Sequence, residues 1–347
     1  MINGDLCHEL LLKNITPKLS FDEKKDDETR RKEIREKFIS LTGLDKIAEN
    51  ATDPNFEVIF KEDKGNYFLT RFEFSSEVGE RVPCYLLTPK TKGNGTKTKK
   101  FPVAITLQGH VSGFHNSVGV AKYPADFDGG LERRSMALQA VENGYVALAI
   151  EQRGMGERKP TLKKRGADVN CRFASFVAIS MGRTLIGERV WDVSKAIDML
   201  SNFPECDTDK IIITGNSGGG TTSYYAACFD ERIKICAPSC AFCPYKSSVL
   251  DILHCECNQI PQAINYFEMQ DLSELICPRE LIIITGEKDD IFPIEGVKEG
   301  YKTVEKIYGH YNAGSNCRLK ITPREHWWCT DIVWNAIGEA VKKLWFK

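Results

Sequence analysis

The fold of this 347-residue chain is decided by one stretch, IIITGNSGG, which spans residues 211–219. Consecutive β-branched residues are typical of a buried strand, and the Gly-x-Ser-x-Gly pattern that follows runs directly into a helix-like segment. A nucleophile on a strained strand-to-helix turn needs small residues on both sides. The stretch therefore predicts a strand, a turn that presents Ser217, and a helix whose first amides stabilise an anion beside that serine.

A phosphate-binding loop is the alternative interpretation of these glycines. Neither a G-x-G-x-x-G fingerprint nor a G-x-x-x-x-G-K-[ST] loop can be read in the stretch, because Ser217 stands where the second glycine of the fingerprint would be. We therefore interpret Ser217 as a nucleophile.

Outward from this stretch, short apolar runs alternate with helix-like segments from residue 101 to the C-terminus. The expected strands span 103–107, 145–150, 211–214, 233–237, 281–285 and 317–321. The expected helices span 131–143, 184–202, 218–229, 294–308 and 330–346. This alternation predicts a doubly wound, mostly parallel sheet of the α/β class. Residues 239–275 exceed what a crossover requires, so we expect an insertion over the carboxyl ends of the strands, where such sheets bind ligands.

The first hundred residues follow a different pattern. Ser20 followed three residues later by Glu23 has the form of a capping box, which predicts one mainly exposed helix that ends before Gly43. Alternating apolar residues predict antiparallel strands over 56–60, 67–74 and 81–87. We expect residues 1–100 to form this helix and an antiparallel extension, and residues 101–347 to form the core.

Composition excludes several classes of protein. Lys and Arg number 47 against 48 Asp and Glu, so the net charge of −1 leaves no positive surplus for a nucleic acid or an anionic membrane. No apolar run approaches the ~20 residues of a membrane span. Thirteen cysteines, an odd number, fit reduced thiols, and the start of the chain shows no secretory signal. We therefore expect a cytoplasmic protein with no nucleic-acid or membrane partner.

A serine nucleophile requires a base, and the chain order Ser, acid, His restricts the choice. Only His254, His310 and His326 follow Ser217 in the chain. The first lies within the expected insertion, and the second ends a helix-like run. His326 lies in the loop between the last expected strand and the last expected helix, and we predict that it is the base.

The expected acid lies after the buried strand 281–285, in the loop that begins at Gly286. A carboxylate at the carboxyl end of a strand can orient the imidazole and stabilise its cation. We predict Asp289 for this role, with Asp290 as the alternative.

Four further residues are expected around the nucleophile. The backbone amides of Gly218 and His110 are the predicted oxyanion donors, because one follows the serine and the other follows the strand 103–107. Trp327 and Trp328 follow the expected base, so at least one is predicted at the pocket mouth. The alternative is that both only cover the last helix.

A group of metal-ligand residues lies within the expected insertion. It consists of Cys240, Cys243, His254, Cys255 and Cys257. This spacing matches no familiar structural zinc site, so we expect buried free thiols, no metal and no cofactor.

Together these residues resemble an α/β-hydrolase, and within that superfamily the acetyl xylan esterase and dienelactone-hydrolase-like branch. The most specific segments are 151–157, 182–193, 215–220, 278–281 and 289–293. The resemblance extends from about residue 101 to the C-terminus, implies the triad Ser217, Asp289 and His326, and assigns 254–258 to an insertion near the pocket. Dienelactone hydrolases proper use a cysteine nucleophile, so Ser217 indicates an esterase.

We therefore expect a serine esterase that forms an acyl-enzyme. The resemblance implies short-chain esters, acetyl in particular, as substrates, either small molecules or acetylated oligosaccharides. An oligomer is compatible with the sequence. The same triad suits an intracellular serine peptidase or amidase, or a lactone hydrolase. A catalytically silent binding module of the same fold is the alternative from a different class.

Overall fold

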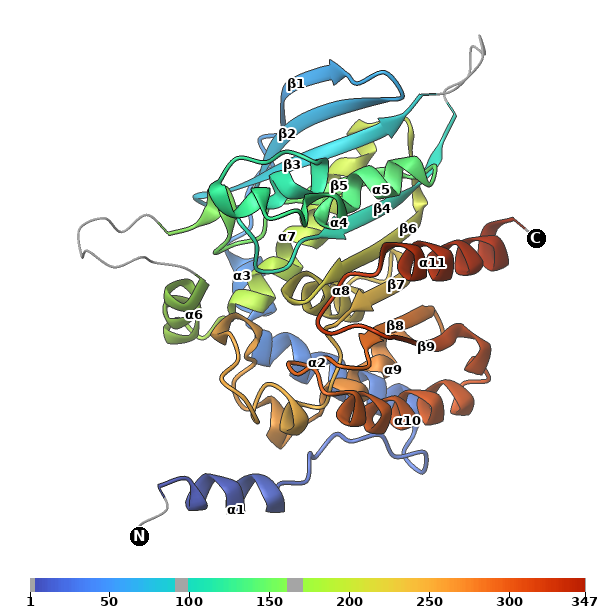
Figure 1. The fold of residues 1–347 in the computed structure, drawn as a ribbon. Coiled ribbons are helices and arrows are strands. Elements are labelled where there is room, and N and C mark those ends of the chain that lie inside the picture. Colours follow the sequence, from blue (N-terminus) through green and yellow to red (C-terminus); the bar gives the residue numbers. More distant parts are fainter. Residues whose placement is uncertain (1–3, 91–98, 161–170, 347) are drawn as a thin grey trace.

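The computed structural model describes residues 4–90, 99–160 and 171–346 of the chain. Within them, one sheet has the strand order β1-β2-β3-β5-β4-β6-β7-β8-β9 (Figure 1). The strands are β1 (Glu57–Asp63), β2 (Tyr67–Glu77), β3 (Glu80–Pro89), β4 (Phe101–Leu107), β5 (Val146–Ile150), β6 (Cys206–Asn216), β7 (Ile233–Ser239), β8 (Glu280–Gly286) and β9 (Cys317–Thr322). Strands β4 to β9 pair in parallel, whereas β1, β2 and β3 pair antiparallel and join the sheet through β5. The predicted mostly parallel sheet with an antiparallel start is confirmed.

Helices cover both faces of the sheet. They are α1 (Leu6–Asn14), α2 (Asp27–Thr42), α3 (Leu44–Glu49), α4 (Leu131–Arg134), α5 (Met136–Glu142), α6 (Cys171–Ser180), α7 (Leu185–Met199), α8 (Gly218–Phe229), α9 (Ser273–Ile276), α10 (Ile294–His310) and α11 (Thr330–Trp345). Ile211 and Ile213 of β6 pack in a buried cluster with α2, α7, α8 and α10, whereas Ile212 packs in another with α5 and α11. Since successive side chains of a strand point to opposite faces, these two groups of helices lie on opposite sides of the sheet.

The expected N-terminal helix begins later than its sequence pattern indicates. Helix α2 starts at Asp27, and the Asp26 side chain accepts a hydrogen bond from the Thr29 amide at 2.9 Å. The capping box predicted at Ser20 is wrong, because this segment pairs with the connection between β7 and β8 instead: the Leu19 amide donates to the Tyr266 carbonyl. The helix is also less exposed than predicted, since one of its faces is buried in the core.

Two further differences concern helices. The helix expected over 131–143 is divided into α4 and α5 at Ser135, whose ψ of 52° interrupts the helical backbone. Helix α6 is an addition to the predicted elements. Its residues Phe176, Val177 and Ile179 are exposed, so the helix lacks the one-sided apolar periodicity that would reveal it in the sequence.

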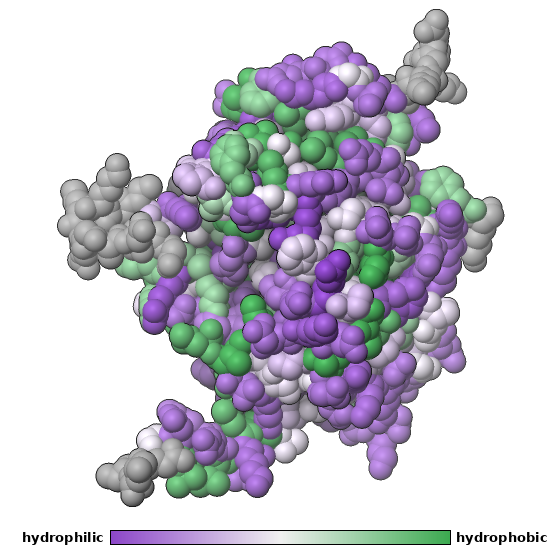
Figure 2. All heavy atoms as spheres, viewed as in Figure 1, coloured by the Kyte–Doolittle hydropathy of each residue, from purple (hydrophilic) through white to green (hydrophobic). Residues whose placement is uncertain are grey.

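The surface and the cysteines carry few special features. Hydrophilic residues dominate the face seen in Figure 2, with hydrophobic residues in small separate groups. Of the described helices, none has both the length and the apolar character that crossing a bilayer requires. All thirteen cysteines lie in the described ranges as free thiols, and most of them are buried.

Candidate active site

Ser217 occupies a strained turn between β6 and α8. Its φ of 56° and ψ of −127° lie in a region that residues with a side chain rarely adopt. Such a conformation costs about 1–3 kcal/mol and persists only where the surroundings impose it. Here the Ser217 amide donates to the Ser239 carbonyl at 2.9 Å, and the Ser217 carbonyl accepts from the Thr221 amide at 2.9 Å.

Close backbone contacts explain the glycines around this serine. A Cβ atom on Gly219 would lie 2.0 Å from the Leu107 carbonyl oxygen, and one on Gly215 would lie 2.5 Å from the same oxygen. The loop after β4 lies equally near, because a Cβ on Gly109 would be 3.1 Å from the Cβ of Ser217. Only glycine allows β4, β6 and α8 to meet this closely, so the turn needs the glycines on both sides.

His326 and Asp289 form a hydrogen-bonded pair beside this turn. His326 Nδ1 donates to Asp289 Oδ2 at 2.9 Å. The other carboxylate oxygen, Oδ1, accepts the backbone amides of Ile291 and Phe292 at 2.9 and 3.0 Å. Burial alone would raise the pKa of Asp289, but the hydrogen bond and charge of His326, together with these amides, hold it below its usual range. The carboxylate is therefore fixed and ionised.

The other candidates for base and acid occupy different places. His310 lies at the end of α10 and contacts Asp27 on α2, with 2.9 Å between Nε2 and Oδ1. Asp290 is exposed, whereas the Asp289 side chain is fully buried. His254 lines the same cavity as Ser217.

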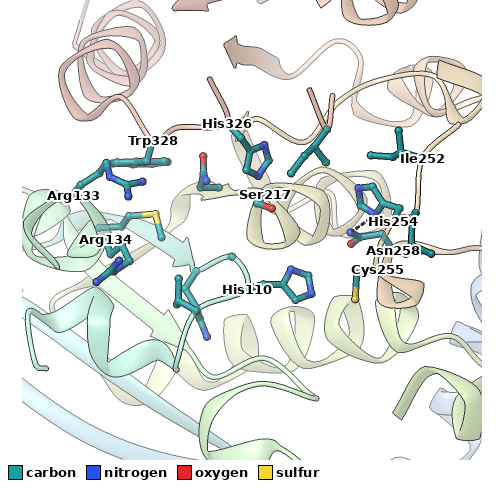
Figure 3. A pocket seen from close by; sticks show the side chains of 17 residues that line it. His110, Arg133, Arg134, Ser217, Ile252, His254, Cys255, Asn258, His326 and Trp328 are labelled. Carbon is teal, nitrogen blue, oxygen red and sulfur yellow. Dashed lines mark hydrogen bonds between the residues drawn. The ribbon is translucent and has the colours of Figure 1, made fainter. Parts of the chain in front are cut away.

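A cavity of about 400 Å³ contains Ser217 and His326 (Figure 3). It is lined by Gln108, Gly109, His110, Val111, Arg133, Arg134, Met136, Asn216, Ser217, Ile252, Leu253, His254, Cys255, Asn258, Ile291, His326 and Trp328. Residues 252–258, from the connection between β7 and β8, form one side of this cavity, and the arginines with Trp328 form the other.

Two backbone amides beside Ser217 are suited to bind an oxyanion. Gly218 is the first residue of α8, so its N–H has no acceptor within the helix. The His110 N–H has no hydrogen-bond acceptor among the described residues. The two residues are adjacent in space, because a Cβ on Gly218 would lie 3.0 Å from Cε1 of the His110 ring.

The two tryptophans differ in burial and in their contacts. Trp328 is 2% exposed, lines the cavity, and donates its indole N–H to Gln139 Oε1 at 2.9 Å. Trp327 is 41% exposed, does not line this cavity, and lies under the Arg133 guanidinium at 3.6 Å from its ring centroid. Only Trp328 is therefore placed to contact a ligand in the cavity.

A buried network after β5 supports the loop that carries His110. Gln108 donates to Glu151 Oε1 at 2.7 Å, and Gln152 donates to the Gln108 carbonyl at 2.6 Å. Thr222 of α8 donates to Gln152 at 2.7 Å. Burial raises the pKa of Glu151 to about 7, although backbone amides oppose this shift. The segment 151–157 thus holds the loop after β4 against α8, a role that its sequence did not reveal.

The arginines of α4 are among the lining residues that the sequence did not indicate. Arg134 pairs with Asp128 at 2.7 Å, whereas the described residues offer Arg133 no carboxylate within ion-pair distance. Burial and the neighbouring Arg134 lower the pKa of Arg133. The charge pattern of 131–134 is that of an ordinary helix, so only the tertiary structure shows that Arg133 faces the cavity.

The cysteine and histidine group expected within the insertion does not come together. Cys240 lies with Asp289 and His326, and the Cys243 thiol faces the Pro293 carbonyl. Cys255 and Cys257 instead join residues from two other segments. The sequence named no partners for Cys255 and Cys257, and the structure places them beside His110 and Cys171.

Comparison with protein-family models matches residues 4–233 to the Abhydrolase family and residues 181–332 to the Prolyl oligopeptidase family. A relative from Bacillus subtilis, the inferred hydrolase YtaP, is 25% identical over 245 residues, which are 69% of this chain and 76% of the relative.

Solved structures with a similar fold include several esterases. An inferred acetyl xylan esterase from Bacteroides fragilis has a TM-score of 0.73 at 16% identity, with 93% of this chain and 83% of that chain covered. A glucuronoyl esterase from Solibacter usitatus has a TM-score of 0.65 at 15% identity, covering 96% and 99%. Acetyl xylan esterase 1 from Thermoanaerobacterium sp. has a TM-score of 0.61 at 15% identity, covering 96% and 98%. At these identities the similarity shows a common fold, and it agrees with the branch that the sequence resembles.

Proposed function

This chain belongs to the Abhydrolase family, and on that premise we propose that it is a serine esterase whose triad is Ser217, His326 and Asp289. The observation that carries the proposal is the 2.9 Å hydrogen bond between His326 Nδ1 and a buried Asp289, beside a cavity that also contains the strained Ser217. A fixed carboxylate and imidazole beside a hydroxyl that lines a cavity are what acyl transfer requires.

The mechanism follows from the roles of these groups. Ser217 Oγ attacks the ester carbonyl while His326 Nε2 takes its proton, and the same nitrogen then protonates the leaving alcohol. Asp289 holds the tautomer of His326 and stabilises the imidazolium. The amides of Gly218 and His110 donate to the oxyanion. Water, deprotonated by His326, then releases the acid from Ser217, so no cofactor is required.

The cavity favours a short acyl group. Its volume of about 400 Å³ is at the small end of the range for ligand sites. In the acetyl xylan esters for which two fold neighbours are named, the sugar supplies the alcohol, whereas in the glucuronoyl esters for which another is named the sugar acid supplies the acyl group. We therefore propose acetyl and other short-chain esters as substrates, with a sugar as the natural alcohol.

A peptidase or amidase is the second candidate. The Prolyl oligopeptidase match spans 181–332 and includes Ser217, Asp289 and His326. Amide hydrolysis uses the same groups but needs a positioned proton donor for a poorer leaving group. Rates on acetyl esters and on aminoacyl amides, measured side by side, separate the two candidates.

The test is covalent labelling followed by a substrate panel. A fluorophosphonate is expected to modify Ser217 alone, as located by peptide mass spectrometry. Nitrophenyl acetate, butyrate and octanoate, acetylated xylo-oligosaccharides and an aminoacyl anilide are then compared. The proposal expects rates that fall with acyl length and negligible anilide cleavage. Labelling at another residue, or a preference for the anilide, contradicts it.

A further inference from the structure

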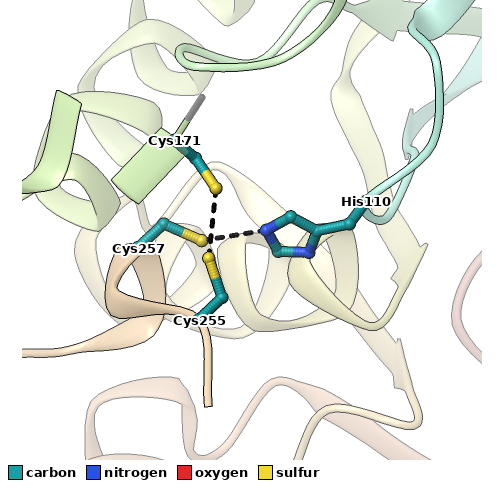
Figure 4. A group of neighbouring side chains, drawn as sticks. All are labelled: His110, Cys171, Cys255 and Cys257. Atoms are coloured by element: carbon teal, nitrogen blue, oxygen red, sulfur yellow. Dashed lines mark hydrogen bonds between the residues drawn. The ribbon is translucent and has the colours of Figure 1, made fainter. Parts of the chain in front are cut away.

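Four side chains with metal-binding atoms meet at the edge of the cavity (Figure 4). His110 follows β4, Cys171 is the first residue of α6, and Cys255 and Cys257 come from the connection between β7 and β8. The His110 Nε2 and Cys257 Sγ atoms are 3.1 Å apart, as are the Sγ atoms of Cys171 and Cys255. All four atoms lie within 4.8 Å of one another.

This donor set fits a tetrahedral zinc ion. Three thiolates and one imidazole form a closed structural site of the Cys₃His type. With Zn–S bonds of about 2.3 Å and a Zn–N bond of about 2.0 Å, the ligand atoms of a tetrahedron lie roughly 3.5–3.8 Å apart. The side chains of this cluster therefore need to move by only about an ångström to coordinate one ion.

A buried arginine supplies an independent argument. Arg189 is 1% exposed, and its Nε and one terminal nitrogen donate to the Arg153 carbonyl at 3.0 and 2.8 Å. Its other terminal nitrogen, Nη1, has no hydrogen-bond partner, and Arg189 has no carboxylate partner within the described ranges. A buried cation is costly without a compensating anion.

The cysteine cluster is placed to provide that anion. The charge of Arg189 acts on His110, Cys171 and Cys257. Zn²⁺ with three thiolates and a neutral imidazole carries a net charge of −1, which balances the charge of Arg189.

We propose that His110, Cys171, Cys255 and Cys257 bind one structural zinc ion. The ion cross-links the loop after β4, the start of α6 and the connection between β7 and β8. The last two segments also meet through a small buried cluster around Cys171 and Cys257 and through the 2.9 Å ion pair between Arg172 and Glu256. It thereby fixes the backbone at His110. The consequence for catalysis, a fixed oxyanion amide, rests on the proposed function, whereas zinc binding does not.

A disulfide is the competing state of the same residues. The Cys171 and Cys255 sulfur atoms are 3.1 Å apart, so a bond could close after a small movement. Oxidation would use two of the three thiols and leave only Cys257 and His110 as donors. The zinc site uses all four donors, and for this reason we favour it.

The test measures zinc in the full-length chain, purified with a phosphine reductant and dialysed against EDTA to remove loosely held ions. Elemental analysis is expected to give one zinc per chain, and a mercurial reagent is expected to release it. Replacement by Co²⁺ should give the visible bands and thiolate charge-transfer absorption of a tetrahedral site. Cys171→Ala and Cys257→Ala should lose the ion, while Cys206→Ala, a matched buried cysteine at the start of β6, should keep it.

Each outcome decides the matter. Zinc-free protein that also fails to take up Zn²⁺ or Co²⁺ after reduction overturns the inference, as does a Cys171–Cys255 disulfide in the non-reduced peptide map. Equal zinc loss in the Cys206→Ala control also overturns it. If the cluster variants fail to fold, the zinc content and cobalt spectrum of the wild-type protein still decide. Zinc without ester hydrolysis contradicts only the proposed function, and a zinc-free active esterase contradicts only this inference.

Discussion

Two neighbouring walls of the same cavity are held in different ways. The first, which we call the strand-held wall, contains Ser217, Asp289 and His326. These residues follow shortly after strands β6, β8 and β9, respectively, so the hydrogen-bonded sheet fixes where their backbones lie. The second, which we call the loop-held wall, surrounds Cys255 and Cys257 and consists of connecting segments without such pairing. The contrast teaches that a parallel sheet positions catalytic side chains by itself, whereas a wall of loops requires cross-links between side chains.

Breaking the strand-held wall should have the largest effect. Ser217→Ala removes the proposed nucleophile without removing core volume, and we expect turnover of nitrophenyl acetate to fall by roughly 10³-fold or more. The melting temperature should stay within a few degrees of the wild type. Ser201→Ala, at an exposed serine, is the control. More than about a tenth of the activity in Ser217→Ala would remove Ser217 from the triad.

The acid of the triad provides the next test. Asp289→Asn keeps the shape of the side chain but favours the wrong tautomer of His326, a change that lowers turnover ~10⁴-fold in a serine protease. Asp290→Asn should change turnover by less than about tenfold, because this side chain is exposed. Turnover of both variants on one acetyl ester is the measurement. The reverse ranking would move the acid to Asp290.

Weakening the loop-held wall should affect stability more than chemistry. Removal of zinc with a strong chelator under reducing conditions should lower the melting temperature by several degrees, because metal binding contributes to folding. Turnover should fall by about tenfold, far less than in Ser217→Ala, since a displaced oxyanion amide costs less than a missing nucleophile. Calorimetry before and after addition of Zn²⁺ measures the first effect. An unchanged melting temperature after confirmed zinc removal would show that the wall needs no metal.

The two tryptophans test whether a ring that lines the cavity contributes more to stability and substrate preference than a ring that does not. Trp328→Ala removes a buried ring and should cost about 3–5 kcal/mol of unfolding free energy, whereas Trp327→Ala should cost about 1 kcal/mol or less. Urea unfolding measures both. On two esters that differ only in the alcohol, Trp328→Phe should change the ratio of kcat/KM and Trp327→Phe should not. Equal effects of the two phenylalanine variants would place neither ring at the ligand.

The smallest effect concerns Glu151, which supports the loop shared by both walls. Its pKa of about 7 in the folded protein exceeds the value of about 4.3 expected after unfolding. The folded state therefore binds more protons over this interval, so this residue's contribution to stability is full below about pH 4 and is lost as the pH rises to 7. Glu151→Gln should reduce the fall in melting temperature between pH 5 and pH 8. The exposed Glu132→Gln should leave that fall unchanged, and an identical fall in both variants contradicts the prediction.

The residues of the strand-held wall could be predicted from the sequence because the patterns that indicate them lie within short segments of the chain. The glycines around Ser217 report contacts within one turn, and chain order alone restricted the base to three histidines. The start of α2 was misplaced because a segment 247 residues away competes for the backbone around Leu19. The partners of these cysteines could not be predicted for the same reason: Cys257 meets His110 across 147 residues, and no rule of spacing reaches that far.

His110 joins the two walls through different parts of one residue. Its main-chain N–H is the proposed second oxyanion donor, and any amino acid except proline can supply this group. Its imidazole contacts Cys257, and only that contact depends on the side chain. In related proteins we therefore expect this histidine to be conserved together with the cysteines at 171, 255 and 257. Where those cysteines are replaced, we expect the histidine to vary. An alignment of the family in which the four positions vary independently would contradict this expectation.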